Sequence, residues 1–513
     1  MAAAAVEPYS ESEAGIIRNG VFAALPDAFG ISLGYTNDPT TFKNRSTPAP
    51  STRSMACKAQ TSGRIYLHSG PRTELHEIIR QEYARHQDRA VPRNTLRQAV
   101  QGMLDTFAYQ NFDAAAGEYT NRCCRPPRET EMRPWRLVTE IGWTGGGVLA
   151  YPLVLCRDAL GADAEAPLAA AMSGEQLFDR IADAYNENSG LLNDLMAPNA
   201  AGSQVNGWWT GYGLVKDCHC AYTVGSAVHY LTKTMDYLHQ NGKPCPAKWM
   251  DAAQKVLHTV MDLQRADGAF GYTYSTQERK VLDWSGFAGC WFAPALVYLY
   301  RLTGEERCLH SAEKALDYYH TFVKDLNCYG TPMDTWKAVD EEGNLAFMRG
   351  SRLLYEQTGK AEFLQYMKDS AGYEFLWRYG YKTYPEHTPL NQGWSACGGA
   401  VTSVSNPHIH PMGVIIDTDL RYLARVTGDG YYASRAADSA AWMLQCLELY
   451  PAATGYGRYG ILSERWCPSD GLDVERFSDG RPFSSWFSHN LWASACVLEA
   501  ACELLLEIEH KKG

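Results

Sequence analysis

Hydrophobic residues recur at positions i, i+3, i+4 and i+7 from about residue 94 onward, which is the spacing of one face of a helix. Polar segments rich in glycine and aromatic residues interrupt this pattern at intervals. The pattern predicts twelve helices, near residues 94–108, 144–159, 174–188, 220–241, 247–265, 285–303, 305–324, 342–358, 361–379, 411–427, 430–448 and 484–509.

The predicted helices are of two kinds. WSGFAGCWFAPALVYLYRL (284–302) and GVIIDTDLRYLARV (413–426) are apolar on nearly every face, whereas EERCLHSAEKALDYYHTFV (305–323) is apolar on one face. Helices that are apolar all round are buried, and one-sided helices face solvent. Six inner helices alternating with six outer ones predict a mainly α fold, the (α/α)6 toroid of six helical hairpins. Of Asp417 and Asp419, we expect one to be a buried, hydrogen-bonded carboxylate and the other to lie at the helix surface.

A short motif recurs where one helix ends and the next begins. YRLTGEERCL (300–309), YEQTGKAEFL (355–364) and ARVTGDGYYA (424–433) each contain Thr-Gly followed closely by a new helical pattern. Glycine adopts the left-handed conformation that commonly ends a helix. The motif therefore indicates an internal repeat of helical hairpins, with a period near 60 residues.

Residues 1–90 follow another pattern. Short β-like runs, GVFAALPDAFGISLGY and GRIYLHSG, flank a stretch rich in Pro, Ser and Thr, and a helix is predicted near 72–88. We therefore expect two parts: a small β-rich N-terminal appendage with a linking helix at 1–90, and the toroid catalytic domain at 91–513.

The connections between the predicted helices alternate in length. Those after the odd-numbered helices are long, about 17 to 35 residues, and are rich in Trp, Tyr, Gly, Asp and Arg. Long loops in a compact domain are usually functional. In a toroid they would all lie on the face formed by the N-termini of the inner helices, so we expect the site there.

Three carboxylates in these connections are the predicted catalytic residues. Asp334 lies between Pro332 and Trp336, about eight residues before the next predicted helix, which is too far for an N-cap. Glu140 is followed by several glycines that leave room for a substrate to approach. Asp283, in LDWSGF, is the third candidate. Two carboxyl groups are the usual machinery of glycoside hydrolysis, one as acid and one as base or nucleophile.

Substrate-binding side chains are expected from the same connections. Tryptophan faces can stack on the apolar face of a sugar ring, and His and Arg can bind its polar groups. The predicted substrate-binding residues are Trp143, Trp209, Trp284, Trp336, His408, His410, Arg465 and Trp466. Candidates to bind a substrate carboxylate, each also explained as ordinary surface charge, are Lys337, Arg349, Arg465 and Arg476.

Composition narrows the class of ligand. The chain of 513 residues has 14 Trp and 31 Tyr, more aromatic side chains than its core needs, which suits a carbohydrate ligand. Its net charge of −11 argues against nucleic acid and anionic membranes as partners, because phosphate binding needs a basic surface. No apolar run approaches the roughly 20 residues that span a bilayer.

The expected compartment is the cytoplasm. The start, MAAAAVEPYSESE, has neither the basic region nor the apolar length of a secretory signal. The 15 cysteines are scattered and odd in number, which favours reduced thiols over a disulfide framework.

Metal and cofactor sites are not predicted. Cys123-Cys124 and Cys218-His219-Cys220 contain zinc-ligand types, but their spacing is not that of a standard zinc site, and we expect no metal. The run Gly145-Gly146-Gly147 lacks the strand and the lysine of a phosphate-binding loop, so no nucleotide cofactor is expected either.

The hairpin repeat and its loops resemble the six-hairpin glycosidase superfamily over roughly residues 94–509. The resemblance implies a saccharide site in the funnel at the N-termini of the inner helices. LDWSGF is loosely similar to the catalytic segment of unsaturated-uronyl hydrolases, although their paired aspartates are missing. CCRPP (123–127) resembles a zinc motif of β-L-arabinofuranosidases without its partner motif. PMDTWKAVDEEG and SNPHIHPMG look like motifs of a β-glucuronidase-like family.

The favoured function is an exo-acting glycoside hydrolase whose substrate is an oligosaccharide containing a uronic acid. A sugar epimerase or polysaccharide lyase, with His408 or His410 as the base, is the first alternative. A non-catalytic toroid that serves as a binding module is the second. The sequence leaves open whether the chain forms a homo-oligomer.

Overall fold

The computed structural model describes most of the helical region and the backbone of short strands elsewhere. The described residues are 2–6, 9–12, 15–25, 28–33, 63–67, 70–86, 89–113, 118–123, 133–135, 139–142, 146–161, 165–196, 204–210, 213–331, 337–382, 395–403, 406–447, 449, 460, 462, 464–466, 485–486, 488–489 and 491–510.

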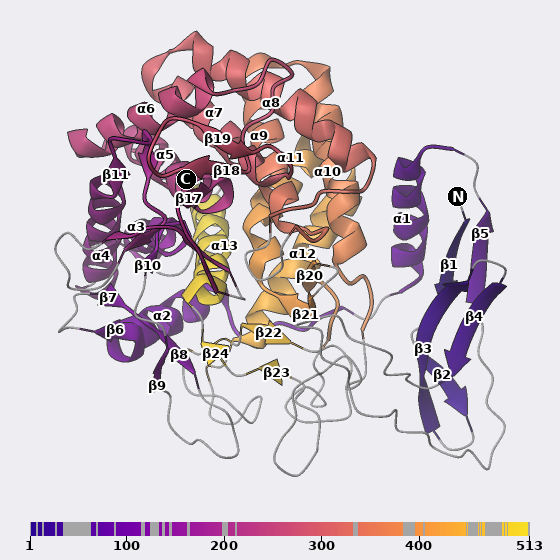
Figure 1. Ribbon diagram of the computed structural model, residues 1–513. Coiled ribbons are helices and arrows are strands. Elements are labelled where there is room, and N and C mark those ends of the chain that lie inside the picture. The colour runs from indigo at the N-terminus through magenta and orange to yellow at the C-terminus, as the bar shows by residue number, and fades with distance from the viewer. Residues whose placement is uncertain are drawn as a thin grey trace.

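In the described part of the chain, twelve α-helices alternate between an inner ring and an outer ring, so the fold is the predicted (α/α)6 toroid (Figure 1). The inner helices are α3 (Gly147–Leu160), α5 (Ala221–Gln240), α7 (Phe292–Thr303), α9 (Glu342–Thr358), α11 (Asp417–Thr427) and α13 (Leu491–His510). The outer helices are α2 (Leu96–Thr106), α4 (Glu165–Asp183), α6 (Ala247–Asp262), α8 (Glu306–Lys324), α10 (Ala361–Trp377) and α12 (Gly430–Cys446).

The inner ring is closed. Each inner helix contacts the next in chain order, and α13 returns to pack on α3. Two short 3₁₀ helices, η4 (Ala288–Trp291) and η5 (Met412–Ile416), extend α7 and α11 at their N-terminal ends. Because the ring has six members, α5 and α11 stand opposite each other across its axis.

The two predicted kinds of helix are confirmed by burial. In α5 the residues from Ala221 to Asp236 are all buried, whereas α8 buries residues spaced three and four apart, beginning with Cys308 and Leu309. Gly304, Gly359 and Gly428 end α7, α9 and α11 in the left-handed conformation, with φ of 73°, 64° and 69°. The Thr-Gly motif therefore marks helix ends as predicted.

Short antiparallel strands precede the inner helices. They form the sheets β24–β8–β9, β10–β13–β14, β17–β18–β19 and β20–β21–β22–β23. Their bounds are β8 (Asn121–Cys123), β9 (Arg133–Trp135), β10 (Thr139–Glu140), β13 (Leu195–Met196), β14 (Gln204–Val205), β17 (Cys218–Cys220), β18 (Thr273–Ser275), β19 (Val281–Asp283), β20 (Ala400–Ser403), β21 (Asn406–His410), β22 (Arg465–Trp466), β23 (Ser485–Trp486) and β24 (Ser488–His489).

Three further short hairpins belong to the connections as well. They pair β6 (Phe112–Asp113) with β7 (Glu118–Tyr119), β11 (Tyr185–Asn186) with β12 (Leu191–Leu192), and β15 (Trp208–Thr210) with β16 (Gly213–Val215). The long connections thus pair with one another at the N-terminal ends of the inner helices.

Among the described residues of 1–90, five strands and one α-helix come before the toroid. The strands are β1 (Ala2–Val6), β2 (Tyr9–Ser12), β3 (Gly15–Leu25), β4 (Ala28–Leu33) and β5 (Gly63–Leu67), and they lie to one side of the helical body (Figure 1). Helix α1 (Leu75–Arg85) packs against α10. Arg80 bonds Asp429 at 2.6 Å and the Tyr83 hydroxyl donates to Asp438 at 2.5 Å. These contacts attach α1 to the outer ring.

Two predicted helix starts are wrong. Helix α4 begins at Glu165, not near 174, because Gly174 continues the helix. A Cβ at Gly174 would lie 2.6 Å from the Ala150 carbonyl oxygen, so only glycine allows α3 to pack this closely. Helix α13 begins at Leu491, not near 484, because residues 485–489 contribute to strands β23 and β24.

Candidate functional site

Four inner helices bring side chains together near the axis of the toroid, at the end where the long connections lie. Tyr222 comes from α5, Glu342 from the first position of α9, Met412 from η5 and Cys496 from α13. The Tyr222 hydroxyl is hydrogen-bonded to the Glu342 carboxylate and lies 3.9 Å from Met412 Sδ. Since α5 and η5 belong to opposite sides of the ring, Tyr222 reaches across the axis. We call these four residues the axial cluster.

Burial sets the protonation state of the axial cluster. Burial, and then the neighbouring Glu342 carboxylate, raises the pKa of Tyr222 well above 10, so the phenol is neutral and acts as a donor. Burial also raises the pKa of Cys496 well above 9, so this residue is a thiol. A neutral donor beside a carboxylate is an arrangement that can bind a hydroxyl-rich ligand.

Asp283, a predicted catalytic residue, forms a second group of polar side chains with Lys337 and Tyr272. The Lys337 ammonium lies 2.6 Å from Asp283 Oδ2 and 4.6 Å from the centre of the Tyr272 ring. The side chain of Asp283 is 34% exposed and that of Lys337 is 18% exposed, so solvent reaches both. Lys337 has a φ of 52°, in the left-handed region that is uncommon for a residue other than glycine. Such strain is more frequent at functional sites than elsewhere.

His410 and Trp466, both predicted to bind substrate, belong to a third group. The His410 ring stacks on the Trp492 ring at a centroid distance of 5.8 Å, and the Trp492 indole N–H donates to Glu464 at 3.3 Å. Trp466 lies in strand β22 and pairs with Ile409, the neighbour of His410 in strand β21. His410 precedes Met412 by two residues, so this group adjoins the axial cluster.

Glu140, the predicted partner of Asp334, lies deep in the molecule. It is 2% exposed, and β10 places it opposite Leu195. The segment after it folds back tightly: Gly147 N donates to the Ile141 carbonyl, and Ser226 Oγ donates to the Gly142 carbonyl at 3.0 Å. Glu140 is therefore part of the junction between α3 and α5.

His219, next to two cysteines that could have been zinc ligands, is held by two other side chains. His219 Nδ1 lies 2.8 Å from Asp194 and Nε2 lies 3.0 Å from Ser189 Oγ. The Cys220 amide donates to the same aspartate at 2.9 Å. Ser189, Asp194 and His219 are each 1% exposed, so this chain of bonds anchors β17 at the start of α5 and offers no nucleophile to solvent.

Three consecutive acids, Asp340 to Glu342, lie where α9 begins, and each has a different environment. Asp340 accepts from Gly343 N and Thr331 N, both at 3.1 Å, and burial raises its pKa to about 8. Burial and the neighbouring Glu374 carboxyl raise the pKa of Glu341 well above its usual value, since two adjacent carboxyls cannot both ionise readily. Glu342 belongs to the axial cluster. The second acid thus faces the outer ring and the third faces the axis.

Arg378 neutralises the acids between the two rings. Its guanidinium bonds Glu374 at 2.8 Å, Asp417 at 2.9 Å and the Gly413 carbonyl at 2.8 Å. Burial raises the pKa of Asp417 to about 7 despite this arginine. This network holds η5 against α9 and α10, and so positions Met412.

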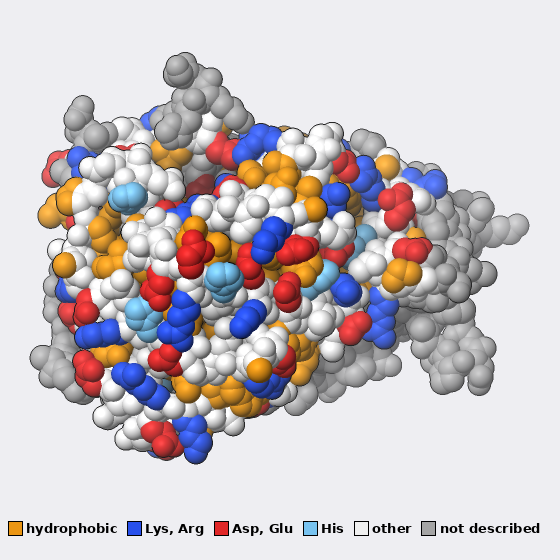
Figure 2. Space-filling view, turned by 90° about the horizontal axis from the view of Figure 1, so that it is seen from above, with side chains coloured by type: hydrophobic (Ala, Val, Ile, Leu, Met, Phe, Trp, Pro, Cys, Tyr) orange, Lys and Arg blue, Asp and Glu red, His pale blue; other side chains and the backbone are white. Residues whose placement is uncertain are grey.

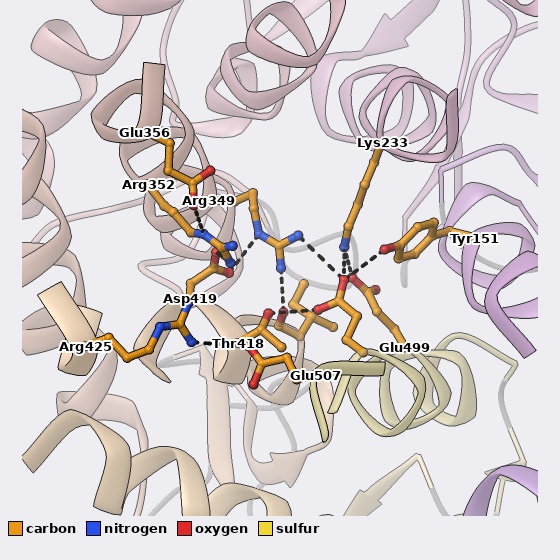
Figure 3. A network of polar contacts seen from close by, with 12 residues as sticks. Tyr151, Lys233, Arg349, Arg352, Glu356, Thr418, Asp419, Arg425, Glu499 and Glu507 are labelled. Carbon is orange, nitrogen blue, oxygen red and sulfur yellow. Dashed lines mark hydrogen bonds and ion pairs between the residues drawn. The ribbon is translucent and has the colours of Figure 1, made fainter. Parts of the chain in front are cut away.

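A second ionic network crosses the ring further along the axis (Figure 3). Lys233 lies 2.5 Å from Glu499 and 2.7 Å from Glu503, and its ammonium is 4.1 Å from the Tyr151 ring centre. Arg349 bonds Asp419 at 2.8 Å. Lys233 follows Tyr222 by eleven residues on α5, roughly 16 Å at 1.5 Å per residue. We call this network the ionic plug, because its buried side chains fill the axis.

Two sequence interpretations are corrected here. Asp419 does not lie at the helix surface: it is fully buried, because Arg349 and Arg352 both bind its carboxylate. Arg349 was a candidate to bind a substrate carboxylate, but its guanidinium is committed to Asp419 and to the Ile415 carbonyl, at 2.8 and 2.9 Å. It is 6% exposed and belongs to the ionic plug.

Several predicted residues cannot be placed. Asp334, Trp143, Trp336, Cys124 and Arg476 lie outside the described residues. Trp209, His408, Arg465 and Cys123 lie in strands whose backbone alone is described for these positions. Trp284 is half-buried, with the Arg265 guanidinium 5.2 Å from its ring centre. The structure therefore brings His410 close to Trp492, and Asp283 close to Lys337, but leaves the predicted single pocket untested.

No group of three or more His, Cys, Asp or Glu side chains is placed to hold a metal ion in the part of the chain that the structure describes. The cysteines there are thiols, and all but Cys245 are buried. Burial raises the pKa of Cys218 to about 11 and that of Cys220 further still.

Sequence reasoning missed the axial cluster and the ionic plug. Tyr222, Lys233 and Glu342 lie inside predicted helices, whereas the candidate residues were sought in the connections between them. One signal was available: inner helices were predicted to be apolar on every face, so a charged residue at their centre, such as Lys233, had to be paired or functional.

The charge on the surface does not point to a particular ligand. Seen from above, the surface mixes basic and acidic side chains, with no continuous area of one sign on that face (Figure 2). Within the described ranges, none of the helices combines the length and apolar character needed to cross a membrane.

Comparison with solved structures supports the fold. A family 76 glycoside hydrolase (mannosidase) from Bacteroides thetaiotaomicron has a TM-score of 0.50 and 13% identity, covering 81% of this chain and 99% of its own. A cellobiose 2-epimerase from Spirochaeta thermophila has a TM-score of 0.51 and 12% identity, with 86% and 100% covered. A sugar epimerase from a ruminal bacterium has a TM-score of 0.52 and 10% identity, with 80% and 98% covered.

These similarities define the class: the chain has the six-hairpin (α/α)6 toroid fold, as the sequence predicted. No protein-family model matches the chain. No curated protein matches it significantly in sequence.

Proposed function

We propose that this protein is a carbohydrate-active enzyme, and specifically a glycoside hydrolase that acts on the end of an oligosaccharide. The structures that share its fold are named as a mannosidase and as sugar epimerases, so the same toroid carries sugar chemistry in other proteins. The long connections and the axial cluster supply the carboxylates, phenols and indoles that such chemistry uses.

The ionic plug is the observation that carries the exo mode of action. Lys233, Glu499 and Asp419 are buried and bonded across the axis, so a sugar chain cannot thread through the ring. We propose that the substrate enters from the long connections with its end directed toward Tyr222 and Glu342. Cleavage at that end releases a terminal sugar, which is exo action.

Two carboxyl groups are required for the reaction, and we propose that Asp283, Asp334 and Glu140 supply at least one of them. Asp283 is accessible and bonded to Lys337. Asp334 precedes Lys337 by three residues and so belongs to the same connection. Glu140 is 2% exposed, so a catalytic role for it requires substrate to reach the junction of α3 and α5.

We propose a uronic acid as the terminal sugar. Lys337 holds its ammonium at the mouth, 2.6 Å from a half-exposed Asp283 carboxylate. The Lys337 ammonium can bind the carboxylate of the sugar beside Asp283 or in its place. Its strained backbone supports a role beyond surface charge.

A sugar epimerase is the second candidate, because His410 stacks on Trp492 beside Glu464. An epimerase needs a base that removes the proton next to the carbonyl of an open-chain sugar, and a histidine on an aromatic ring can serve. Two of the structures with this fold are named as sugar epimerases.

A cytoplasmic location and the division of the chain near residue 90 remain proposals. The first is supported by the absence of disulfides among the described cysteines. The second is supported by the change from strands β1–β5 to helices.

The test is an activity screen of the purified full-length protein. Nitrophenyl uronides, nitrophenyl hexosides and unsaturated disaccharides are incubated with the wild type and with Asp283→Asn, and Asp267→Asn is the exposed control. We expect release from uronides by the wild type and the control, and a loss of about 10²-fold or more in Asp283→Asn. Deuterium incorporation at C2 of a reducing sugar in D₂O, without glycoside cleavage, would instead establish the epimerase.

A further inference from the structure

We infer that Glu342, rather than one of the mouth carboxylates, is the catalytic base of the proposed hydrolysis. This inference rests on the proposed function and assigns its second carboxyl group. It is carried by the way that four inner helices converge on this side chain.

The position of Glu342 suits contact with the end of a substrate. Tyr222 reaches across the axis from α5, and its hydroxyl meets both Glu342 and Met412, which come from α9 and η5. The ionic plug, which includes Arg349 seven residues further along α9, closes the axis below them. A terminal sugar that stops above the plug would lie against Glu342, which is 4% exposed, so this role, like that of Glu140, requires the substrate to reach a buried side chain.

Two features favour the ionised form of Glu342 that a base requires, against the opposing effects of its burial and of the adjacent Glu341 carboxyl. Glu342 is the first residue of α9, where the positive end of the helix dipole stabilises a carboxylate. The phenol of Tyr222 is neutral and donates to that carboxylate. The hydrogen bond from Tyr222 also orients the carboxylate.

Glu341 provides a comparison within the same turn. It is fully buried and lies beside Glu374, while Glu342 retains 4% exposure and faces the axis. Adjacent helix residues point about 100° apart, so one faces the space between the rings and the other the axis. The difference in environment separates a structural acid from a catalytic one.

The proposed step conserves atoms and charge. Glu342 removes a proton from water while the water oxygen bonds the anomeric carbon. The glycosidic bond from that carbon to the leaving oxygen breaks, and the leaving oxygen takes its electron pair. That oxygen then receives a proton from a second carboxylic acid, for which Asp283 is the described candidate.

The test is chemical rescue of Glu342→Ala on an activated glycoside that the wild type hydrolyses. We expect kcat to fall by about 10²-fold or more. Azide, a small anion that can attack the anomeric carbon in place of the activated water, should restore turnover and yield a glycosyl azide. Glu341→Gln is the control and should keep its activity. Tyr222→Phe should shift the acidic side of the pH profile to higher pH, because Glu342 loses the hydrogen bond that favours its ionised form.

The outcomes separate this inference from the proposed function. A wild type that is inactive on every glycoside refutes the proposed function itself. A wild type that is active, with Glu342→Gln retaining more than a tenth of its kcat/KM, refutes the inference alone. A folded Glu342→Ala protein that azide does not rescue also refutes it, since a structural residue gives that result. If Glu342→Ala does not fold, Glu342→Gln decides.

Discussion

Replacing Lys233 by methionine removes the central cation of the ionic plug while keeping the length of the side chain. Lys233 is buried, and its ammonium binds Glu499 at 2.5 Å and Glu503 at 2.7 Å. The substitution leaves Glu499 with the Tyr230 hydroxyl at 2.9 Å and Glu503 with the Thr418 hydroxyl at 2.8 Å. Two buried carboxylates then share one remaining cation, Arg349, which lies 3.9 Å from Glu503.

The expected loss follows from the cost of leaving a buried charge uncompensated. Breaking a buried ion pair by removing one partner costs about 3–5 kcal/mol. Glu499 and Glu503 each retain a hydrogen bond. The expected loss of stability in Lys233→Met therefore lies near the lower end of this range, at about 3 kcal/mol. An unfolding entropy of about 2.1 cal/mol/K per residue gives roughly 1 kcal/mol/K for this chain, so the Tm falls by about 3 °C.

Differential scanning calorimetry of the two proteins measures this change. Lys248→Met is the matched control, because Lys248 binds Asp179 and Asp183 at the surface, with 42% of its side chain exposed. Such a pair contributes about 0–1 kcal/mol, so the control Tm should stay within about 1 °C. An equal Tm for Lys233→Met and the wild type would show that the plug does not hold the ring together.

Three further predictions concern other parts of the molecule. Gly372→Ala should loosen α1, because a Cβ at this position would lie 2.0 Å from the His76 ring. Proteolysis between α1 and α2 should therefore accelerate. Gly350→Ala is the control and should not show this effect, because its Cβ would meet Leu316 at 3.3 Å. Burial raises the pKa of Asp340 to about 8 from 3.8, so the folded state holds a proton that the unfolded state loses, and stability falls as the pH rises between these values. Asp340→Asn should therefore make the slope of unfolding free energy against pH less negative, by up to about 1.4 kcal/mol per pH unit. Denaturant titrations at pH 5–7 measure this slope, and an unchanged slope would contradict the prediction. Trp284→Ala should mainly raise KM on a glycoside, and a fall in kcat at constant KM would show that it does more than bind.

The fold could be predicted from the sequence because its signals are local and repeated. Helix periodicity, the contrast between apolar and one-sided helices, and the Thr-Gly ends at Gly304, Gly359 and Gly428 each point to the toroid. The start of α4 could not be predicted, because Gly174 is read as a break unless the packing of α3 against it is known.

The site was predicted only in part, because its chemistry depends on contacts across the ring. Asp283 and His410 were predicted as site residues from the composition of their connections, and they stay predictions. Glu342 was not, since three consecutive acids at a helix start look alike in sequence. The difference between Glu341 and Glu342 arises from Glu374 and Tyr222, which lie 33 and 120 residues away along the chain.

The most direct test of the proposed exo-acting hydrolase uses an oligosaccharide that ends in a uronic acid and carries a label at its reducing end. The purified full-length protein is added, and the anomeric protons are followed by NMR. We predict that the terminal uronic acid appears first as a free monosaccharide, while the labelled chain shortens by one sugar at a time. Labelled fragments of intermediate length at early times, or exchange at C2 without any cleavage, would contradict it.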